Sequence, residues 1–395
     1  MNFIKRNMKL IAVSVGHFSN DFYMNLIPPI LFVFGVELGL SLSQQSMIAF
    51  LIMTGGSLLQ PAIGYFLDKV GKSSFLIFSI LWISIGMSVT GFITNYYMLL
   101  VIAGLSAIGS AVYHPLGSSI AANLSTGSRG KSLSVFMTIG GFAAAITPMV
   151  SIPIVNRFGL KYLVLFAIPG LITALFLKTA NVDKIEWKIN NEIEKKKGPA
   201  IEKVKVVWLS LILLISVIRG AVSSVLVVFG VQLMLAKGVN VITGGIILSI
   251  HMFLRSAGTL TGGLMSDELG EKRVMVFFNI ILLLVYVMTM FTTGFITVIG
   301  MVILGYVLQV TATANITISH NILPDNINLG TGMILGLSYT FAGLLVLIFG
   351  KYADIFGLIQ VAKVSTIIVA VALLISLFIP MKYVKLNKTE SNLNM

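Results

Sequence analysis

Long apolar runs recur from one end of this chain to the other, and they restrict its possible folds more than any other feature. A transmembrane helix needs about 20 mostly apolar residues, whereas the strands of a membrane barrel alternate over roughly ten. The runs here are continuous and helix-length. With 57% hydrophobic and only 10% charged residues, a water-soluble domain of this length could not cover itself with polar surface. The sequence therefore predicts an all-α integral membrane protein.

The runs and the polar stretches between them predict twelve transmembrane helices. One long polar interruption, which contains three consecutive lysines from Lys195, separates two groups of six. We therefore expect an N-terminal six-helix bundle at 1–179, a cytoplasmic linker at 180–205, and a C-terminal six-helix bundle with a cytoplasmic tail at 206–395. The predicted spans are 10–36, 44–67, 74–94, 96–122, 131–156, 161–179, 206–236, 240–265, 273–293, 295–322, 330–354 and 357–381.

Lys and Arg residues are distributed unevenly between the two sides of this arrangement. Of the 27 in the chain, twenty fall on the side of the termini and the linker, five on the opposite side, and Arg219 and Arg255 inside spans. Basic loops stay in the cytoplasm, so both termini are expected there, in a bacterial or archaeal plasma membrane. The same placement accounts for the net charge of +13 without a nucleic-acid partner.

The chain also contains an internal duplication. The stretch 64–72, Gly-Tyr-Phe-Leu-Asp-Lys-Val-Gly-Lys, returns at 263–273 as Gly-Leu-Met-Ser-Asp-Glu-Leu-Gly-Glu-Lys-Arg. Likewise, Phe-Val-Phe-Gly-Val-Glu-Leu at 32–38 matches Val-Val-Phe-Gly-Val-Gln-Leu at 227–233. Two parallel six-helix repeats are typical of transporters with a binding site near the middle of the membrane.

These segments resemble a known family. The elbow at 64–72 resembles the loop signature between the second and third helices of the major facilitator superfamily, with Ser73 in place of the usual second basic residue. Within that superfamily, three segments resemble the fosmidomycin-resistance group of drug exporters. They are His17-Phe-Ser-Asn-Asp21, Ser57-Leu-Leu-Gln-Pro61 and Gly109-Ser-Ala-Val-Tyr-His-Pro115. The resemblance implies the major facilitator fold and transport by alternating access.

Two positions depart from the pattern. The fosmidomycin-resistance group typically has a Glu after the His-Pro pair, where this chain has Leu116, so a proton-carrying carboxylate is missing there. The fifth-helix signature of proton antiporters is reduced to Gly140-Gly141 and Thr147-Pro148.

The resemblance further implies that the two elbows gate transport. The elbow Asp of each half would brace helix ends of the other half and stabilise one conformational state. The gating residues implied are Gly64, Asp68, Gly71 and Lys72 in the first elbow, and Gly263, Asp267 and Gly270 in the second.

Ionisable residues inside the spans are the strongest functional candidates. A charge at the bilayer centre costs at least ~2.5 kcal/mol, so it requires a partner, a wet cavity or a function. His17 and Asp21 lie four residues apart and share one helix face. We predict that this pair, together with His114, holds and releases the coupling protons, since histidine titrates close to neutral pH. The alternative is that Asp21 pairs with His17 or Arg219 only to fix helix packing.

A second group of polar residues is predicted to bind substrate. Arg219 keeps its charge when desolvated and can hold a carboxylate or phosphonate with two parallel hydrogen bonds. Arg255 follows His251 by one helical turn and lies on the same face. We therefore predict a small anionic substrate contacted by Arg219, His251 and Arg255, with Asn20 and Asn25 in support. A static salt bridge or snorkelling to the membrane surface is the alternative for the arginines.

Other chemistry has no motif in the sequence. The chain has no cysteine, no Gly-rich phosphate loop, no zinc-protease motif and no nucleophile elbow. We expect no enzymatic activity, no cofactor and no metal, with a proton gradient as the energy source. The prediction is a monomeric, proton-coupled exporter of a small anionic or amphiphilic compound. Two alternatives stay open: a proton-coupled uptake symporter for a metabolite such as an organic acid or sugar, and a receptor or assembly factor that kept the fold without transporting.

Overall fold

The computed structural model of the chain describes residues 3–70, 72–124, 129–185, 203–323, 330 and 332–379. These residues form twelve helical spans that are long and apolar enough to cross a membrane. The predicted all-α integral membrane fold is therefore confirmed. The chain divides into two compact units, Met1–Glu194 and Lys195–Met395. Within the predicted linker, residues 186–202 lie outside the described part.

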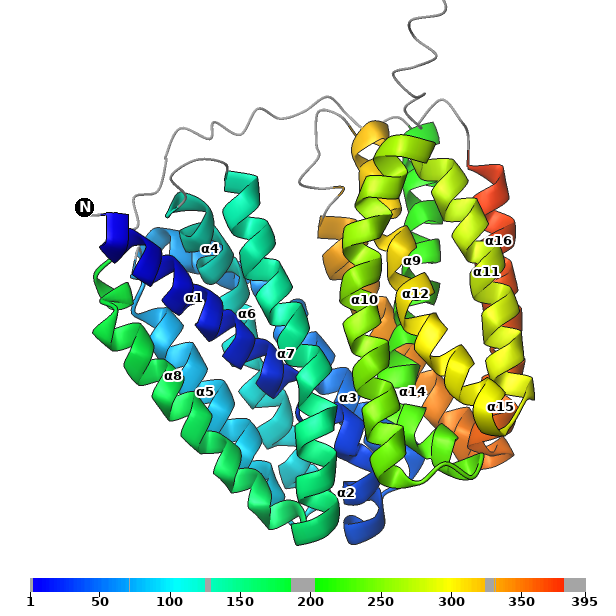
Figure 1. Cartoon of the computed structure of the whole chain (residues 1–395), viewed down its shortest axis with the longest axis horizontal. Helices are drawn as coiled ribbons and strands as arrows, with labels where there is room; N and C mark the ends of the chain where they lie inside the picture. The colour runs from blue at the N-terminus through cyan, green and yellow to red at the C-terminus, as the bar shows by residue number, and fades with distance from the viewer. Residues whose placement is uncertain are drawn as a thin grey trace, which may run out of the picture. The chain divides into compact units, whose positions relative to one another are not determined.

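The first unit contributes six of the spans, and several of them consist of more than one helix (Figure 1). Its elements are α1 (Phe3–Met24), η1 (Pro28–Ile30), α2 (Leu31–Leu38), α3 (Leu42–Ser57), α4 (Gln60–Val70), α5 (Phe75–Val89), η2 (Thr90–Phe92), α6 (Tyr96–Asn123), α7 (Arg129–Phe158), η3 (Leu160–Phe166), α8 (Ala167–Thr179) and η4 (Val182–Lys184).

The second unit contributes the other six spans, and three of its helices extend over 29 residues or more. Its elements are α9 (Lys203–Ala236), α10 (Val241–Leu269), α11 (Glu271–Phe291), α12 (Gly294–Ile322), a π-helical segment η6 (Gly332–Leu337), α14 (Ser338–Phe356), α15 (Leu358–Val364) and α16 (Thr366–Phe378).

The first predicted span, 10–36, differs from expectation because it is not one helix. α1 ends at Met24, and η1 begins at Pro28, which is followed by Pro29. Proline has no backbone N–H and a fixed φ, so it interrupts helical hydrogen bonding but fits the first turn of a new helix. The proline pair therefore separates α1 from α2 inside the membrane span.

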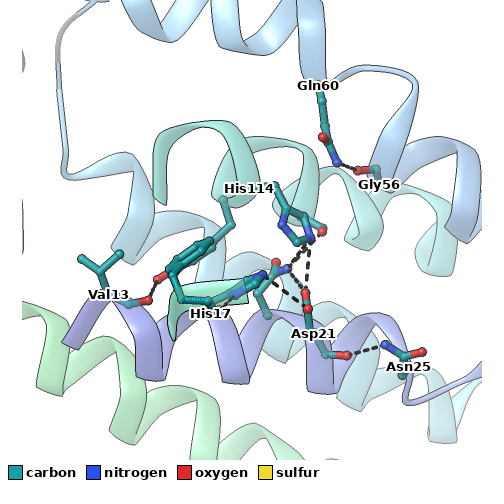
Figure 2. Close-up of polar contacts among 11 residues, drawn as sticks. Val13, His17, Asp21, Asn25, Gly56, Gln60 and His114 are labelled. Atoms are coloured by element: carbon teal, nitrogen blue, oxygen red, sulfur yellow. Dashed lines mark hydrogen bonds and ion pairs between the residues drawn. The ribbon is translucent and has the colours of Figure 1, made fainter. Parts of the chain in front are cut away.

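The second predicted span, 44–67, is also interrupted. α3 ends at Ser57, and α4 begins at Gln60, directly before Pro61. Pro61 occupies the first turn of α4, where a missing N–H leaves no hydrogen bond unmade. The Gln60 side chain donates from Nε2 to the Gly56 carbonyl at 2.7 Å, so a backbone acceptor freed by the break is satisfied (Figure 2).

The second elbow is a tight turn at Gly270. This residue lies between Leu269, the last residue of α10, and Glu271, the first of α11. Its φ of 88° is a left-handed value that favours glycine because any Cβ would be strained there. In the first elbow, α4 runs to Val70, and Gly71 lies outside the described residues.

Glycines allow α10 and α12 to pack closely. A Cβ at Gly262 would lie 2.2 Å from the Val310 carbonyl oxygen, and one at Gly305 would lie 2.1 Å from the His251 carbonyl oxygen. Both distances are impossible for a real Cβ, so the two backbones meet only because these positions are glycine. Close contact between small residues is a common way for membrane helices to associate.

Large apolar side chains cover much of the outer surface. Phe78, Phe253, Leu264 and Phe295 are each about half exposed or more. An apolar surface of this kind is unfavourable in water but matches the hydrocarbon of a bilayer. The exposed side chains therefore fit a lipid-embedded protein.

Lys237 ties the end of α9 to the end of α11. Its Nζ donates to the carbonyls of Thr289 at 2.6 Å, Met290 at 2.9 Å and Thr292 at 2.6 Å. The last carbonyls of a helix have no partner within the helix, and a cation there also meets the negative end of the helix dipole. The ammonium uses all three of its hydrogens on these carbonyls.

We expect Lys237→Met to destabilise the second unit, because three carbonyls lose a charged donor. A hydrogen bond to a charged group contributes about 1.5–3 kcal/mol, so the detergent-purified protein should unfold several degrees lower in a thermal unfolding assay. Lys351→Met, at an exposed position on α14, is the matched control. Equal unfolding temperatures for the two variants would contradict a structural role for Lys237.

Candidate functional site

One carboxylate and two imidazoles meet in the first unit. His17 and Asp21 lie one turn apart on α1, with His17 Nε2 3.3 Å from Asp21 Oδ2. His114 on α6 places its Nε2 3.2 Å from the other carboxylate oxygen, Oδ1. Figure 2 shows both imidazoles directed at the Asp21 carboxylate. The His17 side chain is 1% exposed, against 19% for Asp21 and 27% for His114, so the cluster is accessible from the His114 side.

The orientation of His17 determines where a proton must lie. Its Nδ1 is 2.7 Å from the Phe136 carbonyl oxygen, which can only accept, so Nδ1 carries a hydrogen. Nε2 then faces Asp21 either with a lone pair or with a second hydrogen. Nε2 and the carboxylate oxygen are 3.3 Å apart, so a proton on either atom would lie between the two side chains. The geometry of the pair is therefore compatible with a site that binds a proton.

Asn20, which the sequence predicted to bind substrate, belongs to the same cluster. Its Nδ2 donates to Asp21 Oδ1 at 3.0 Å and to Ser110 Oγ at 3.1 Å, and it lies 3.3 Å from His114 Nε2. Its Oδ1 is buried and has no hydrogen-bond partner in the described part of the chain. Asn20 thus links the carboxylate to α6 and leaves one acceptor unused.

Asn25, also predicted to contact substrate, makes a backbone contact. Its Nδ2 donates at 2.8 Å to the carbonyl oxygen of Asp21, close to the point where α1 ends (Figure 2). The amide therefore satisfies a carbonyl at the C-terminal end of the helix that carries the cluster.

Residues that the sequence did not single out hold the His17 ring in place. Phe136 on α7 stacks on it with centroids 4.0 Å apart, and Tyr113 lies parallel at 6.5 Å. The Tyr113 hydroxyl donates to the Val13 carbonyl at 2.7 Å. A Cβ at Gly140 would lie 2.4 Å from Asp21 Oδ2 and from His17 Cε1, so only glycine leaves room for the pair.

Sequence signals existed for some of these residues. Ser110 precedes His114 by four residues and therefore shares its helix face, and Tyr113 is adjacent to it. Gly140 lies in the glycine pair of the fifth predicted span. The contact of His17 with the Phe136 carbonyl could not be predicted from the sequence, because every residue has a backbone carbonyl.

In the second unit, Arg219 is buried in the helical bundle and Arg255 is half-buried. Arg219 on α9 is 5% exposed and donates from Nη1 to the Leu308 carbonyl at 3.1 Å and to Gln309 Oε1 on α12. The Nε atoms of Arg219 and Arg255 are both buried without a hydrogen-bond partner among the described residues.

Neither arginine is neutralised by an acid. Within the described ranges, no carboxylate lies at ion-pair distance from Arg219 or Arg255. A charge held away from water without a counter-ion is unfavourable, and a bound anion would offset that cost. The pair therefore has the charge and the free donors to take up an anionic group.

His251, the third residue predicted to bind an anion, is enclosed by the protein. It is 0% exposed, and its Nδ1 donates to the Met301 carbonyl at 2.8 Å. Its Nε2 is buried and unpartnered in the part of the chain that the structure describes. The observed contact joins α10 to α12, one turn before Arg255.

Each elbow has one glycine four residues before its Asp, Gly64 in the first and Gly263 in the second, and both glycines lie where two helices meet. A Cβ at Gly64 would be 3.5 Å from Pro115 Cβ on α6, and one at Gly263 would be 3.5 Å from Thr313 Cγ2 on α12. These are ordinary van der Waals distances, so an alanine would fit at either position. The two elbows make matching contacts in their own units.

Two of the charged residues that were predicted to gate transport are exposed. Lys72 and Asp267 both lie on the surface of their units. The side chain of Asp68 and the whole of Gly71 lie outside the described residues.

A comparison of the sequence with models of known protein families agrees with this architecture. Residues 13–328 match the family model described as Major Facilitator Superfamily, which is well over half of the chain. The chain belongs to the Major Facilitator Superfamily. The resemblance that the elbow and the three segments predicted is thus confirmed.

Among superfamily members, the chain is similar to the Fosmidomycin resistance protein of Escherichia coli (strain K12), with 26% identity over 382 residues, covering 93% of this chain and 92% of the relative. It is also similar to the uncharacterized MFS-type transporter YfnC of Bacillus subtilis (strain 168), with 21% identity over 360 residues, covering 88% and 87%.

The fold matches solved transporters of the superfamily. The crystal structure of a bacterial homolog of the human lysosomal transporter Spinster aligns with a TM-score of 0.80 and 16% identity, covering 96% of this chain and 97% of that one. The chain is therefore a multi-pass membrane transporter of the Major Facilitator Superfamily, and it acts on small molecules across a lipid bilayer.

Proposed function

We propose that this transporter exports a small anionic or amphiphilic compound in exchange for protons, by alternating access. It acts as a monomer in a bacterial or archaeal plasma membrane with both termini in the cytoplasm, and it catalyses no chemical reaction. The carrying observation is the pair Arg219 and Arg255, two guanidinium groups inside the bundle with unpartnered Nε atoms and no carboxylate at ion-pair distance in the described part.

The arginine pair supports an anion with several oxygen acceptors. Arg219 is already oriented by the Leu308 carbonyl and Gln309, so less conformational entropy is lost when its remaining donors meet a ligand. The Nε of Arg255 is buried without a hydrogen-bond partner among the described residues, so this donor is available to a ligand. Guanidinium groups bind phosphonates and carboxylates through paired hydrogen bonds. Fosmidomycin, the compound in the name of the Escherichia coli relative, is a phosphonate and could therefore bind guanidinium groups in this way.

The His17, Asp21 and His114 cluster supports proton coupling. A proton on either His17 Nε2 or Asp21 would lie between the two side chains, and the exposure of His114 gives that proton a route to water. A change in hydration between two conformational states would shift the balance between holding and releasing it. The elbow residues keep the gating role that the resemblance implies, as part of the same proposal.

The test uses bacterial cells that lack their own exporter of the compound. Cells that express the chain should tolerate more fosmidomycin than cells with an empty vector, and a protonophore at a sublethal dose should remove the difference. Increased sensitivity on expression would contradict export. Tolerance that persists with the protonophore would contradict proton coupling.

Uptake by proton symport is the second candidate, and Leu116 favours it. The fosmidomycin-resistance group typically has a Glu at this position, whereas Leu116 is 3% exposed and belongs to an apolar cluster with Tyr113 and Phe136. A carboxylate is thus replaced by a packed apolar side chain. A symporter would make expressing cells more sensitive to a toxic substrate, so the same experiment distinguishes the two.

Gly140→Ala should disable coupling without changing any ionisable group. The added methyl would overlap Asp21 Oδ2 and His17 Cε1, each 2.4 Å from the new Cβ, and so push the pair apart. We expect the fosmidomycin tolerance conferred by the chain to fall at least about tenfold, the effect of a misplacement of about 1 Å at a functional site. Gly104→Ala is the control, because its Cβ would make an ordinary 3.4 Å contact with Leu51. Wild-type tolerance in Gly140→Ala would contradict the role of the cluster.

A further inference from the structure

We propose that His17, Asp21 and His114 form a binding site for a divalent transition-metal ion such as Zn²⁺. The three side chains offer ligand atoms that all lie within 4.8 Å of one another. Two imidazoles and one carboxylate are a frequent ligand set for such ions, with water in the open position. The site rests on this geometry and holds whether or not the chain exports an anion.

The spacing of the ligand atoms fits a metal ion. Ligands held ~2.0–2.1 Å from a tetrahedral zinc ion lie roughly 3.3 Å from each other. His17 Nε2 is 3.3 Å from Asp21 Oδ2, and His114 Nε2 is 3.2 Å from Asp21 Oδ1. The three ligand atoms are thus gathered within 4.8 Å of one another, and a small rearrangement of the side chains would let them enclose an ion.

His17 is oriented as metal-bound histidines are. Its Nδ1 donates to the Phe136 carbonyl at 2.7 Å, which fixes the other nitrogen, Nε2, as the ligand atom. Stacking on Phe136 with centroids 4.0 Å apart holds the plane of the ring. The side chain is 1% exposed, and Nε2 has no hydrogen-bond partner among the described residues, so this buried nitrogen is available as a ligand.

Asn20 offers a further oxygen ligand. Its Oδ1 is buried without a partner in the described part of the chain. Rotation of the amide by half a turn would place that oxygen where Nδ2 lies, 3.0 Å from Asp21 Oδ1 and 3.3 Å from His114 Nε2. An ion can reach the site because Asp21 and His114 retain exposure of 19% and 27%. The sequence predicted no metal site, because the ligands come from two helices and follow no spacing motif.

Titration with Co²⁺ alone tests the proposal, because Co²⁺ absorbs visible light strongly in four- and five-coordinate sites. The full chain is purified in detergent through a tag that contains no histidine. We expect one saturable site per chain, from which Zn²⁺ displaces Co²⁺ and excess Mg²⁺ does not. Asp21→Asn and His114→Ala should each weaken Co²⁺ binding by about tenfold or more, whereas His320→Gln, outside the cluster, should bind as the wild type does.

Several results would overturn the site. They are the absence of saturable binding, unchanged affinity in both cluster variants, and loss of binding in His320→Gln alone. X-ray absorption on the Zn²⁺-loaded wild type needs no variant and so does not depend on the folding of a mutant. A coordination shell with two imidazoles supports the proposal, and a shell of oxygen alone refutes it. These measurements involve no transport, so their failure leaves anion export untouched, and a failure of export leaves the metal site untouched.

Discussion

Asp21→Asn is expected to abolish proton-driven transport while substrate exchange continues. The amide has nearly the same shape as the carboxylate but cannot bind a proton in the physiological range, so the contact with His17 loses the group that shares the proton. We expect transport driven by a pH gradient to fall to background, a loss of at least about 100-fold, on the order of general acid–base effects. Exchange of labelled for unlabelled substrate without a gradient should persist, because it needs no net proton movement.

Asp183→Asn is the matched control for this variant. Asp183 lies outside the spans, where the hydrogen bond from Lys178 at 2.5 Å lowers the pKa of its carboxyl. An exposed pair of this kind contributes little to stability. The control should therefore transport as the wild type does. If Asp21→Asn loses exchange and gradient-driven transport together, Asp21 acts in packing, and if it loses neither, the coupling role is wrong.

Arg255→Gln is expected to weaken anion binding more than any other change in the second unit. The substitution removes a charge whose Nε donor has no hydrogen-bond partner among the described residues, so no hydrogen bond of that atom is lost. Hydrogen bonds to charged groups contribute about 1.5–3 kcal/mol, which corresponds to roughly a 10- to 150-fold rise in the Kd for fosmidomycin. Isothermal titration of detergent-purified protein measures this directly.

Arg255→Lys separates charge from shape. Lysine keeps the positive charge but lacks the planar pair of donors, so its affinity for a phosphonate should fall between those of the wild type and Arg255→Gln. Lys351→Gln removes an exposed cation from the same unit and should bind normally. Equal affinity in Arg255→Gln and the wild type would contradict the assignment of Arg255 to the substrate.

The sequence predicted the transmembrane spans better than the interruptions of the helices within them. Apolar length and basic loops locate twelve spans because hydrocarbon imposes a fixed length on a helix. The interruptions at Pro28 and before Pro61 carried a clear proline signal, yet the spans there were predicted as continuous. Apolar runs hide such breaks, since the residues on either side of a kink are as hydrophobic as the rest.

The site could be predicted within helices but not between them. The spacing of His17 and Asp21 places them on one face, and the structure brings them to 3.3 Å. That His114 lies against the same carboxylate could not be predicted, because no periodicity relates α1 to α6. Asn25 was predicted to contact substrate because it is polar and lies in a span, and its hydrogen bond to the Asp21 carbonyl carried no sequence signal.

The sign of the pH gradient that drives substrate into proteoliposomes tests the central claim most directly. In an exchanger, protons leaving an acidic lumen drive labelled fosmidomycin inward, whichever way each molecule is inserted. We predict accumulation when the lumen is more acidic than the bath, and its collapse on addition of a protonophore. Accumulation driven instead by an acidic bath, or independent of the gradient, would contradict proton-coupled export.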